Sequence, residues 1–227
     1  MKYGIMGAMP DEVDQLCARL SGVEVQQYAG VEYHQGRLGD KEVVVCCAGM
    51  GKANAAATTQ VLCGKFGAQA IIFSGIAGNM SEEIGIGDVV VGKEVCYHDA
   101  EVSMICQSAP FLKSYTGDPA LVQAALDACA ALGVKAIAGR IATGDTFVGD
   151  GATKAVIAEK VHPDCVEMEG AAVSQIAARN GVPCVVLRAM SDNADESGHE
   201  LLVVKKFSIA EYVTTATAIV AHMLESL

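Results

Sequence analysis

The sequence has no cluster of lysine and arginine residues, and basic side chains are few overall. Its 227 residues include 16 lysines and arginines against 27 aspartates and glutamates, a formal net charge of −11. Proteins that bind a nucleic-acid backbone neutralise several phosphates with clustered cations. The composition therefore argues against nucleic acid as a partner.

The cysteines show no metal-binding or disulfide pattern. There are nine, an odd number, and neither C-x-x-C nor a cysteine–histidine ligand spacing occurs among them. Such spacings indicate zinc sites, and regularly placed cysteines indicate a disulfide framework. We therefore expect free thiols, no metal site and a reducing compartment, the cytoplasm.

No stretch is long and apolar enough to cross a bilayer. The longest apolar-leaning stretch, residues 212–223, contains threonines and is shorter than the roughly 20 residues that a spanning helix needs. Residues 3–9 are apolar but meet Asp11 and Glu12 at once, unlike the apolar region of a signal peptide. We expect a soluble protein without a membrane partner.

The residues that are present predict one α/β domain over residues 1–227. Apolar side chains make up 52% of the chain, enough for a sizeable core at this length. Strands are predicted at 2–6, 24–28, 31–38, 42–47, 69–74, 88–96, 135–143, 164–168 and 183–190, and helices at 10–20, 52–65, 118–131, 151–160, 169–179 and 199–224. Helices separate the later strands, which indicates parallel crossovers and a mixed central sheet flanked by helices.

Glycine-rich or acidic segments follow five of the predicted strands. These segments are residues 7–12, 74–79, 143–149, 167–169 and 191–192. In open α/β sheets, ligands bind beyond the carboxyl ends of the strands. If the five strands are parallel, their ends bring three or four carboxylates, a glycine-rich floor and one aromatic ring into a single crevice.

The acidic residues and glycines of these segments also have structural interpretations. Asp192 could cap a helix or turn, and the glutamates at 167 and 169 could be solvated. Asp11 and Glu12 open a helix after Pro10, where the helix dipole stabilises a carboxylate by roughly 0.3–1 kcal/mol. Gly75 and Gly78 could form a tight turn between a strand and a helix.

The aromatic ring is more informative. Phe147 lies between Gly144 and Gly149 in a polar loop, although the chain has only five phenylalanines and no tryptophan. A core phenylalanine normally lies in an apolar run, so a stacking platform for a flat ring is favoured. Arg188 could be the exit charge of its strand, or could orient a neighbouring carboxylate through a bidentate contact.

Three other motifs are interpreted as structural. The segment Gly49-Met50-Gly51-Lys52 fails the full phosphate-loop pattern at both ends, and Gly4-Ile5-Met6-Gly7 lacks the dinucleotide fingerprint. The pair His98-Asp99 suggests acid–base chemistry, but adjacent strand residues point to opposite faces of a sheet.

Motifs along nearly the whole chain together resemble one enzyme family. They are Gly7-Ala8-Met9-x-x-Glu12, Gly49-Met50-Gly51-Lys52-x-x-Ala55-Ala56, Ser74-Gly75-x-Ala77-Gly78, Gly87-Asp88-Val89-Val90, Tyr97-His98-Asp99-Ala100, Thr143-Gly144-Asp145 with Phe147, Val166-Glu167-Met168-Glu169 and Arg188-Ala189-Met190-Ser191-Asp192. The chain is similar to the 5′-methylthioadenosine/S-adenosylhomocysteine nucleosidases of the purine nucleoside phosphorylase/uridine phosphorylase superfamily. This resemblance implies a three-layer αβα sandwich that works as a homodimer without metal or cofactor. It also implies cleavage of the N-glycosidic bond of 5′-thio-substituted adenosines, with release of adenine and a thioribose, in methionine salvage.

The resemblance implies a role for each site residue. Asp192 matches the acid that protonates adenine at N7 and must hold a proton near neutral pH, while Glu12 matches the base that deprotonates the attacking water. Glu169 matches the residue that holds the ribose hydroxyls, with Met168 packed against the sugar. Further implied contacts are Met9, Met50 and Leu202 around the 5′ group, Ile76, Ala77 and Gly78 in the glycine-rich loop, Phe147 and Val148 at the adenine, Glu167 beside Glu169, Ser191 and Arg188 as positioners of Asp192, and Val102 and Ile105 from the partner subunit.

Two segments depart from the family pattern. Family members often carry a hydroxyl or another small residue where this chain has Ile76, so a side-chain hydrogen bond to Asp192 is lost there. The Ala77 amide could replace it. Residues 200–207 are also unlike the usual pattern, which affects the assignment of Leu202 to the 5′ pocket.

Hydrolysis of methylthioadenosine and S-adenosylhomocysteine, with 5′-deoxyadenosine as a further candidate, is the favoured function. A nucleoside phosphorylase, a nucleosidase for another adenosine derivative such as aminofutalosine, and a catalytically silent nucleoside-binding protein are the alternatives. Phosphorolysis needs arginines around a phosphate, but the five arginines, at positions 19, 37, 140, 179 and 188, lie outside the loops at 7–12 and 74–79. Binding alone would not require an acid and a base together.

Overall fold

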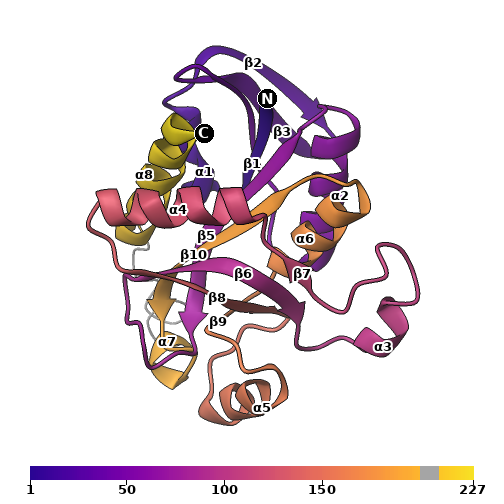
Figure 1. Cartoon of the computed structure of the whole chain (residues 1–227), viewed down its shortest axis with the longest axis vertical. Helices are drawn as coiled ribbons and strands as arrows, with labels where there is room; N and C mark the ends of the chain where they lie inside the picture. The colour runs from indigo at the N-terminus through magenta and orange to yellow at the C-terminus, as the bar shows by residue number, and fades with distance from the viewer. Residues whose placement is uncertain (200–209) are drawn as a thin grey trace.

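The computed structural model describes residues 1–199 and 210–227, and Figure 1 shows their arrangement. The elements are β1 (Lys2–Gly7), α1 (Pro10–Cys17), β2 (Ser21–Tyr28), β3 (Val31–Leu38), β4 (Lys41–Cys47), α2 (Lys52–Gly64), β5 (Ala70–Asn79), β6 (Val89–Tyr97), α3 (Val102–Ile105), β7 (Tyr115–Thr116), α4 (Pro119–Ala131), β8 (Ala136–Thr143), α5 (Gly151–Val161), β9 (Cys165–Glu167), α6 (Gly170–Arg179), β10 (Cys184–Asp192), α7 (Glu196–His199) and α8 (Ala210–Ser226). Within these residues no helix is long and apolar enough to cross a membrane.

One mixed sheet runs through the centre of the molecule, in the strand order β10-β6-β8-β9-β5-β1-β4-β3-β2. An additional pairing between β5 and β10 joins the first part of this order into a closed ring of five strands. Helices α1, α4 and α8 cover one face of the sheet, and α2 and α6 cover the other (Figure 1). The prediction of a mixed central sheet flanked by helices is confirmed.

The apolar runs of the central strands follow from this layering. On β5, Ile72 packs toward α1, α4 and α8, whereas its neighbours Ile71 and Phe73 pack toward α2 and α6. Successive side chains of a strand point to opposite faces, so a strand covered on both faces has no polar alternation. The same division holds on β4, where Val45 and Cys46 face opposite layers.

The five site strands are not all parallel, so the condition on which the single crevice was inferred is not met as stated. Strands β1, β5 and β10 are parallel to one another, but β9 is antiparallel to β5, and β8, which is parallel to β9, runs in the same direction as β9. Strand β9 lies between β8 and β5, and it pairs with β5 only at the tip of that strand, through Gly78 opposite Val166 and Asn79 opposite Cys165. Because β9 runs back along this tip, its carboxyl end still meets the carboxyl ends of β5 and β10.

Several element boundaries differ from the sequence prediction, and three of the differences affect the interpretation. Strand β5 continues to Asn79, so Gly75 and Gly78 are strand residues rather than a turn, because Ser74–Gly78 pairs with β10. The short β7 and α3 are new elements. The helix predicted at 199–224 corresponds to the end of α7 and to α8, and part of it lies outside the described residues.

Candidate active site

A cavity of about 340 Å³ opens where the carboxyl ends of β1, β5, β9 and β10 meet. Twelve of the residues that the sequence assigned to a site line it, namely Met9, Glu12, Met50, Ile76, Ala77, Gly78, Phe147, Glu167, Met168, Glu169, Ser191 and Asp192. Ala8 and Val166 also line it, and their positions directly beside Met9 and Glu167 could have indicated this. The proposed 5′-pocket residue Leu202 lies outside the described residues.

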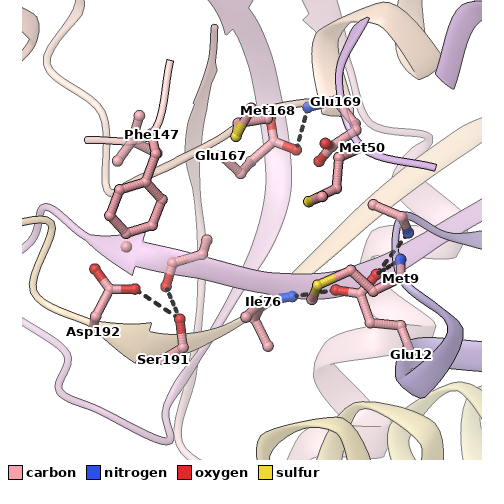
Figure 2. Close-up of a pocket in the computed structure, with 14 residues that line it drawn as sticks. Met9, Glu12, Met50, Ile76, Phe147, Glu167, Met168, Glu169, Ser191 and Asp192 are labelled. Atoms are coloured by element: carbon pink, nitrogen blue, oxygen red, sulfur yellow. Dashed lines mark hydrogen bonds between the residues drawn. The ribbon is translucent and has the colours of Figure 1, made fainter. Parts of the chain in front are cut away.

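Glu12 lies at one end of this cavity, on the first turn of α1 (Figure 2). Its Oε2 accepts hydrogen bonds from the amides of Ala8 at 2.6 Å and Met9 at 3.0 Å. Its Oε1 accepts one from the Ile76 amide at 3.1 Å. Burial raises the pKa of the Glu12 carboxyl, which outweighs the lowering by Arg188 and by the three amides. The side chain therefore stabilises its helix terminus and also presents a fixed carboxyl with a raised pKa to the cavity.

Two glycines provide the space that Glu12 occupies. A Cβ atom at Gly75 would overlap Glu12 Oε1 and Arg188 Nη1, and one at Gly7 would lie 2.7 Å from the Glu12 Cβ. Neither glycine has a positive φ, so close approach rather than backbone freedom explains them.

Arg188 lies behind the cavity wall and is directed at glutamates. Its Nη2 donates a hydrogen bond to Glu167 Oε2, lies 3.6 Å from Glu169 Oε2, and the guanidinium carbon lies 4.1 Å from the Phe73 ring centroid. The expected contact of Arg188 with Asp192 is therefore corrected, because the guanidinium is engaged by Glu167. Being fully buried, this arginine offsets the charge of two carboxylates that could not be desolvated alone.

Glu167 anchors the start of α6. It accepts hydrogen bonds from the Thr143 hydroxyl and from the amides of Glu169 at 3.1 Å and Gly170 at 2.7 Å. The amides at a helix N-terminus lack partners within the helix, and a carboxylate there satisfies them. With every one of these contacts inside the protein, Glu167 supports the cavity wall, and the interpretation of a solvated glutamate is wrong.

Glu169 is buried on the other side of the same arginine. Its Oε1 accepts a hydrogen bond from the Gly51 amide at 2.7 Å. Burial, followed by the charge of Glu167, raises the pKa of Glu169 to about 7, while Arg188 and the Gly51 amide act to lower it. The contact of Gly51 with Glu169 was not predicted, although Gly51 directly follows the cavity residue Met50 in the chain. Gly51 has a positive φ of 93°.

Asp192 lies at the opposite end of the cavity from Glu12, at the end of β10 (Figure 2). Its Oδ2 accepts a hydrogen bond from the Ser191 hydroxyl and its Oδ1 accepts one from the Ala194 amide, both at 2.8 Å. The Ala194 amide thus takes the place expected for Ala77. A Cβ atom at Gly198 would lie 2.7 Å from Asp192 Oδ1, so a glycine behind the carboxyl keeps its space free.

An aromatic ring and three methionines form the apolar part of the cavity. Phe147 lies above the Asp192 end, and Met9 lies at the Glu12 end (Figure 2). Met168 and Met50 line the wall between them. Val148 is buried and lines a small adjoining cavity of about 30 Å³ that shares Phe147 and Asp192 with the larger one.

Other candidate groups lie apart from the cavity. In the segments 1–199 and 210–227, no group of three or more histidine, cysteine, aspartate or glutamate side chains could hold a metal ion. Val102 and Ile105 lie on α3, which projects from the body of the molecule in Figure 1. His98 is buried against Gly144, and Asp99 faces Lys52.

Comparisons with known proteins show the enzyme family to which a chain with this fold and this cavity belongs. The chain matches the phosphorylase superfamily over residues 2–225. A 5′-methylthioadenosine/S-adenosylhomocysteine nucleosidase of Shewanella sediminis (strain HAW-EB3) is 42% identical over 201 residues, which cover 86% of this chain and 87% of that protein. This chain therefore belongs to the phosphorylase superfamily and, within it, to the 5′-methylthioadenosine/S-adenosylhomocysteine nucleosidase family, whose members are N-glycosidases.

Solved structures of this nucleosidase family and of a futalosine hydrolase share the fold of this chain. The nucleosidase of that name from Colwellia psychrerythraea 34H, in complex with adenine, is 32% identical with a TM-score of 0.92, and the match covers 100% of this chain and 96% of that chain. A futalosine hydrolase of Helicobacter pylori is 29% identical with a TM-score of 0.90, and the match covers 100% of this chain and 98% of that chain. The family that the sequence motifs resembled is confirmed.

Proposed function

We propose that this protein hydrolyses the N-glycosidic bond of 5′-methylthioadenosine and S-adenosylhomocysteine and releases adenine. The observation that carries the proposal is the placement of two buried carboxyl groups, Glu12 and Asp192, at opposite ends of one apolar cavity. A carboxyl at each end suits a reaction in which a proton is delivered to the leaving group while another is removed from the nucleophile.

Asp192 is the proposed general acid. Adenine leaves readily only after N7 is protonated, and the Ser191 hydroxyl and Ala194 amide fix the carboxyl in one orientation. Phe147 lines the cavity and is the proposed stacking ring for the purine, and the neighbouring Val148 backbone is proposed to meet the purine edge. The electron pair of the breaking C1′–N9 bond then passes into a protonated, neutral base.

Glu12 is the proposed general base. Three amide donors hold its carboxyl, so its orientation does not depend on the substrate. A carboxyl whose pKa is raised is better matched to accept a proton from water near neutral pH. As the bond to adenine breaks, the ribose acquires oxocarbenium character, and the nearby carboxylates of Glu12 and Glu169 stabilise that charge.

The lining of the cavity supports a thio-substituted nucleoside over a phosphate co-substrate. Met9 and Met50 offer polarizable surface to a 5′-alkylthio group, and Met168 offers it to the sugar. The nearest arginine, Arg188, is engaged by glutamates, so it does not provide an anion site. The Helicobacter futalosine hydrolase is less similar in sequence than the Shewanella nucleosidase, which favours the methylthioadenosine assignment over aminofutalosine.

One incubation separates these reactions. Purified protein is mixed with methylthioadenosine in phosphate-free buffer and in phosphate buffer, and adenine and the sugar product are measured by chromatography. We expect equal rates of adenine release and free methylthioribose in both buffers. Strict dependence on phosphate, or a sugar 1-phosphate product, would instead assign a phosphorylase. Aminofutalosine, offered in a parallel reaction, should be cleaved with a lower kcat/KM.

We further propose that the active unit is a homodimer in the cytoplasm and that Val102 and Ile105 complete the 5′ pocket of the partner subunit. Support comes from the projecting segment that carries α3, where Met104 and Phe111 are 68% and 69% exposed. Large apolar side chains exposed together commonly mark a contact surface. All nine cysteines are free thiols, which suits a reducing compartment.

A further inference from the structure

Three charged side chains outside the catalytic steps join the segments that form the cavity wall. Lys52 Nζ lies 2.8 Å from both carboxylate oxygens of Asp99 and 3.4 Å from Asp145 Oδ2. Asp99 Oδ2 also accepts a hydrogen bond from the Asp145 amide at 2.9 Å. These three residues, here called the Lys52 cluster, connect the start of α2, the end of β6 and the loop after β8.

Consecutive amides at the start of α2 extend this connection to the cavity. The Gly51 amide donates to Glu169 Oε1 at 2.7 Å, and the next amide, that of Lys52, donates to Asp145 Oδ1 at 2.9 Å. Gly51 precedes α2 and has no side chain that could cap this helix. Carboxylates from two other segments therefore satisfy the amides at the start of α2. One short stretch of backbone therefore touches both Glu169 and the loop that carries Phe147.

We propose that the Lys52 cluster is a positioning device that sets the spacing between the sugar-binding Glu169 and the adenine-stacking Phe147. This inference rests on the function proposed above. Phe147 lies two residues beyond Asp145, and Met50, beside Glu169 in Figure 2, lies two residues before Lys52. Loss of the lysine would leave Asp99 and Asp145 to repel each other, and the loop with Phe147 would move away from α2.

Lys52 is the least exposed member of the cluster, since the side chains of Asp99 and Asp145 are 28% and 55% exposed. Its side chain is 22% exposed, and its Nζ lies 5.5 Å from the Tyr97 ring centroid. Burial acts to lower the pKa of Lys52, but the hydrogen bond and charge of Asp99, with those of Asp145, raise it overall. The ammonium is therefore retained at all pH values at which the enzyme would be assayed, and it holds two carboxylates from different segments.

The test removes the charge of Lys52 and keeps a side chain of similar length. Lys52→Met should lower kcat/KM for methylthioadenosine by about tenfold, mainly through KM, since small displacements of binding groups are costly. Lys52→Met should also weaken the binding of free adenine, measured by calorimetry. Lys52→Arg, which keeps the positive charge, should show a smaller loss in both measurements. Lys135→Met is the matched control, because Lys135 forms an ion pair with Asp88 at 3.9 Å outside the cavity.

A double-mutant cycle with Phe147→Ala distinguishes positioning from general stabilisation. If Lys52 acts through the Phe147 loop, Lys52→Met should cost less than about twofold in kcat/KM once the ring is absent, because coupled sites are not additive. The same tenfold loss in both backgrounds, or no loss in either, would overturn the proposal. Asp99→Asn replaces Lys52→Met in the cycle if the methionine variant does not fold. Failure of the unmodified protein to release adenine would refute the proposed function instead, and adenine binding would then still report on the cluster.

Discussion

Gly75 and Glu12 are in such close contact that no side chain fits between them. The Glu12 carboxyl and Arg188 Nη1 both occupy the space where a Cβ atom of Gly75 would stand. The proposed base and the buried arginine therefore approach each other across a glycine of a central strand, and the geometry of the base depends on a residue without chemistry of its own.

Gly75→Ala should accordingly inactivate the protein without unfolding it. The added methyl group must displace the Glu12 carboxyl or Arg188, and a displacement of about 1 Å at a reacting group can cost 10²-fold in rate. We expect a loss of kcat of at least that order, measured with methylthioadenosine, and a retained circular dichroism spectrum. Gly85→Ala is the matched control, because a Cβ atom there meets nothing within 4 Å. Normal turnover of Gly75→Ala would contradict the assigned geometry.

The proposed acid and base can be tested by replacements that keep their shape. Asp192→Asn cannot donate a carboxyl proton and Glu12→Gln cannot accept one, so each should lose about 10²–10⁴-fold in kcat, the usual contribution of general acid–base assistance. Asp11→Asn is a control for the second change, since Asp11 is exposed on the same helix turn. If either variant turns over substrate at a near-normal rate while folded, its residue serves only a structural purpose.

The raised pKa of Glu169 predicts a pH-dependent stability. A carboxyl with a pKa of about 7 in the folded protein, against an ordinary value of 4.5, binds its proton more tightly when folded. Its contribution is therefore most favourable below pH 4.5 and is lost as pH rises toward and through about 7. Glu169→Gln, which stays neutral, should gain stability relative to the unmodified protein between about pH 5 and about pH 8 in denaturant titrations.

The control for this pH experiment is Glu159→Gln, because Glu159 is an exposed carboxylate on α5. Its difference from the unmodified protein should stay constant over the same range. A Glu169→Gln difference that also stays constant would mean that Glu169 keeps an ordinary pKa in the folded protein.

Ile105→Glu should weaken self-association and raise KM for methylthioadenosine together. A carboxylate placed in an apolar interface must be desolvated, and the same residue is proposed to line the partner's 5′ pocket. Sedimentation and steady-state kinetics measure the two effects. Val25→Glu is the control, because Val25 is 56% exposed on β2, at the far end of the molecule from α3 (Figure 1). A fully active, stable monomer would reject the dimer proposal.

Local sequence patterns predicted the elements well where apolar periodicity decides the structure, as in β1 and α2. They failed where long-range pairing decides it. Residues 74–79 contain two glycines and a serine and favour a turn, yet pairing with β10 extends β5 through them. The direction of β9 is also set by a partner distant in sequence, so no local signal could reveal that it runs against β5.

The site was predictable where a residue's position at the end of a strand determines which other side chains lie near it. Carboxylates at strand ends indicated which side chains meet, and Figure 2 shows them around one cavity. The partners of those carboxylates were not predictable. Arg188 engages Glu167 rather than Asp192 of its own strand. Strand alternation alone would place residues 188 and 192 on the same face, but the register of β10 shifts between Met190 and Asp192, and no local pattern reveals that irregularity.

Two residues of β5 contact the proposed acid and base, and their fixed spacing has a consequence for how relatives can diverge. The Ile76 amide holds Glu12, and Gly78 pairs with Asp192, so two anchoring points lie two residues apart, about 7 Å along an extended strand. Neighbouring strands bond to both edges of β5, and a shift in this spacing would break the register of the sheet. Side chains in the surrounding loops, such as Met50, can be exchanged one at a time without that penalty. Substrate preference can therefore change through substitutions in the loops, while the spacing between the acid and the base stays the same.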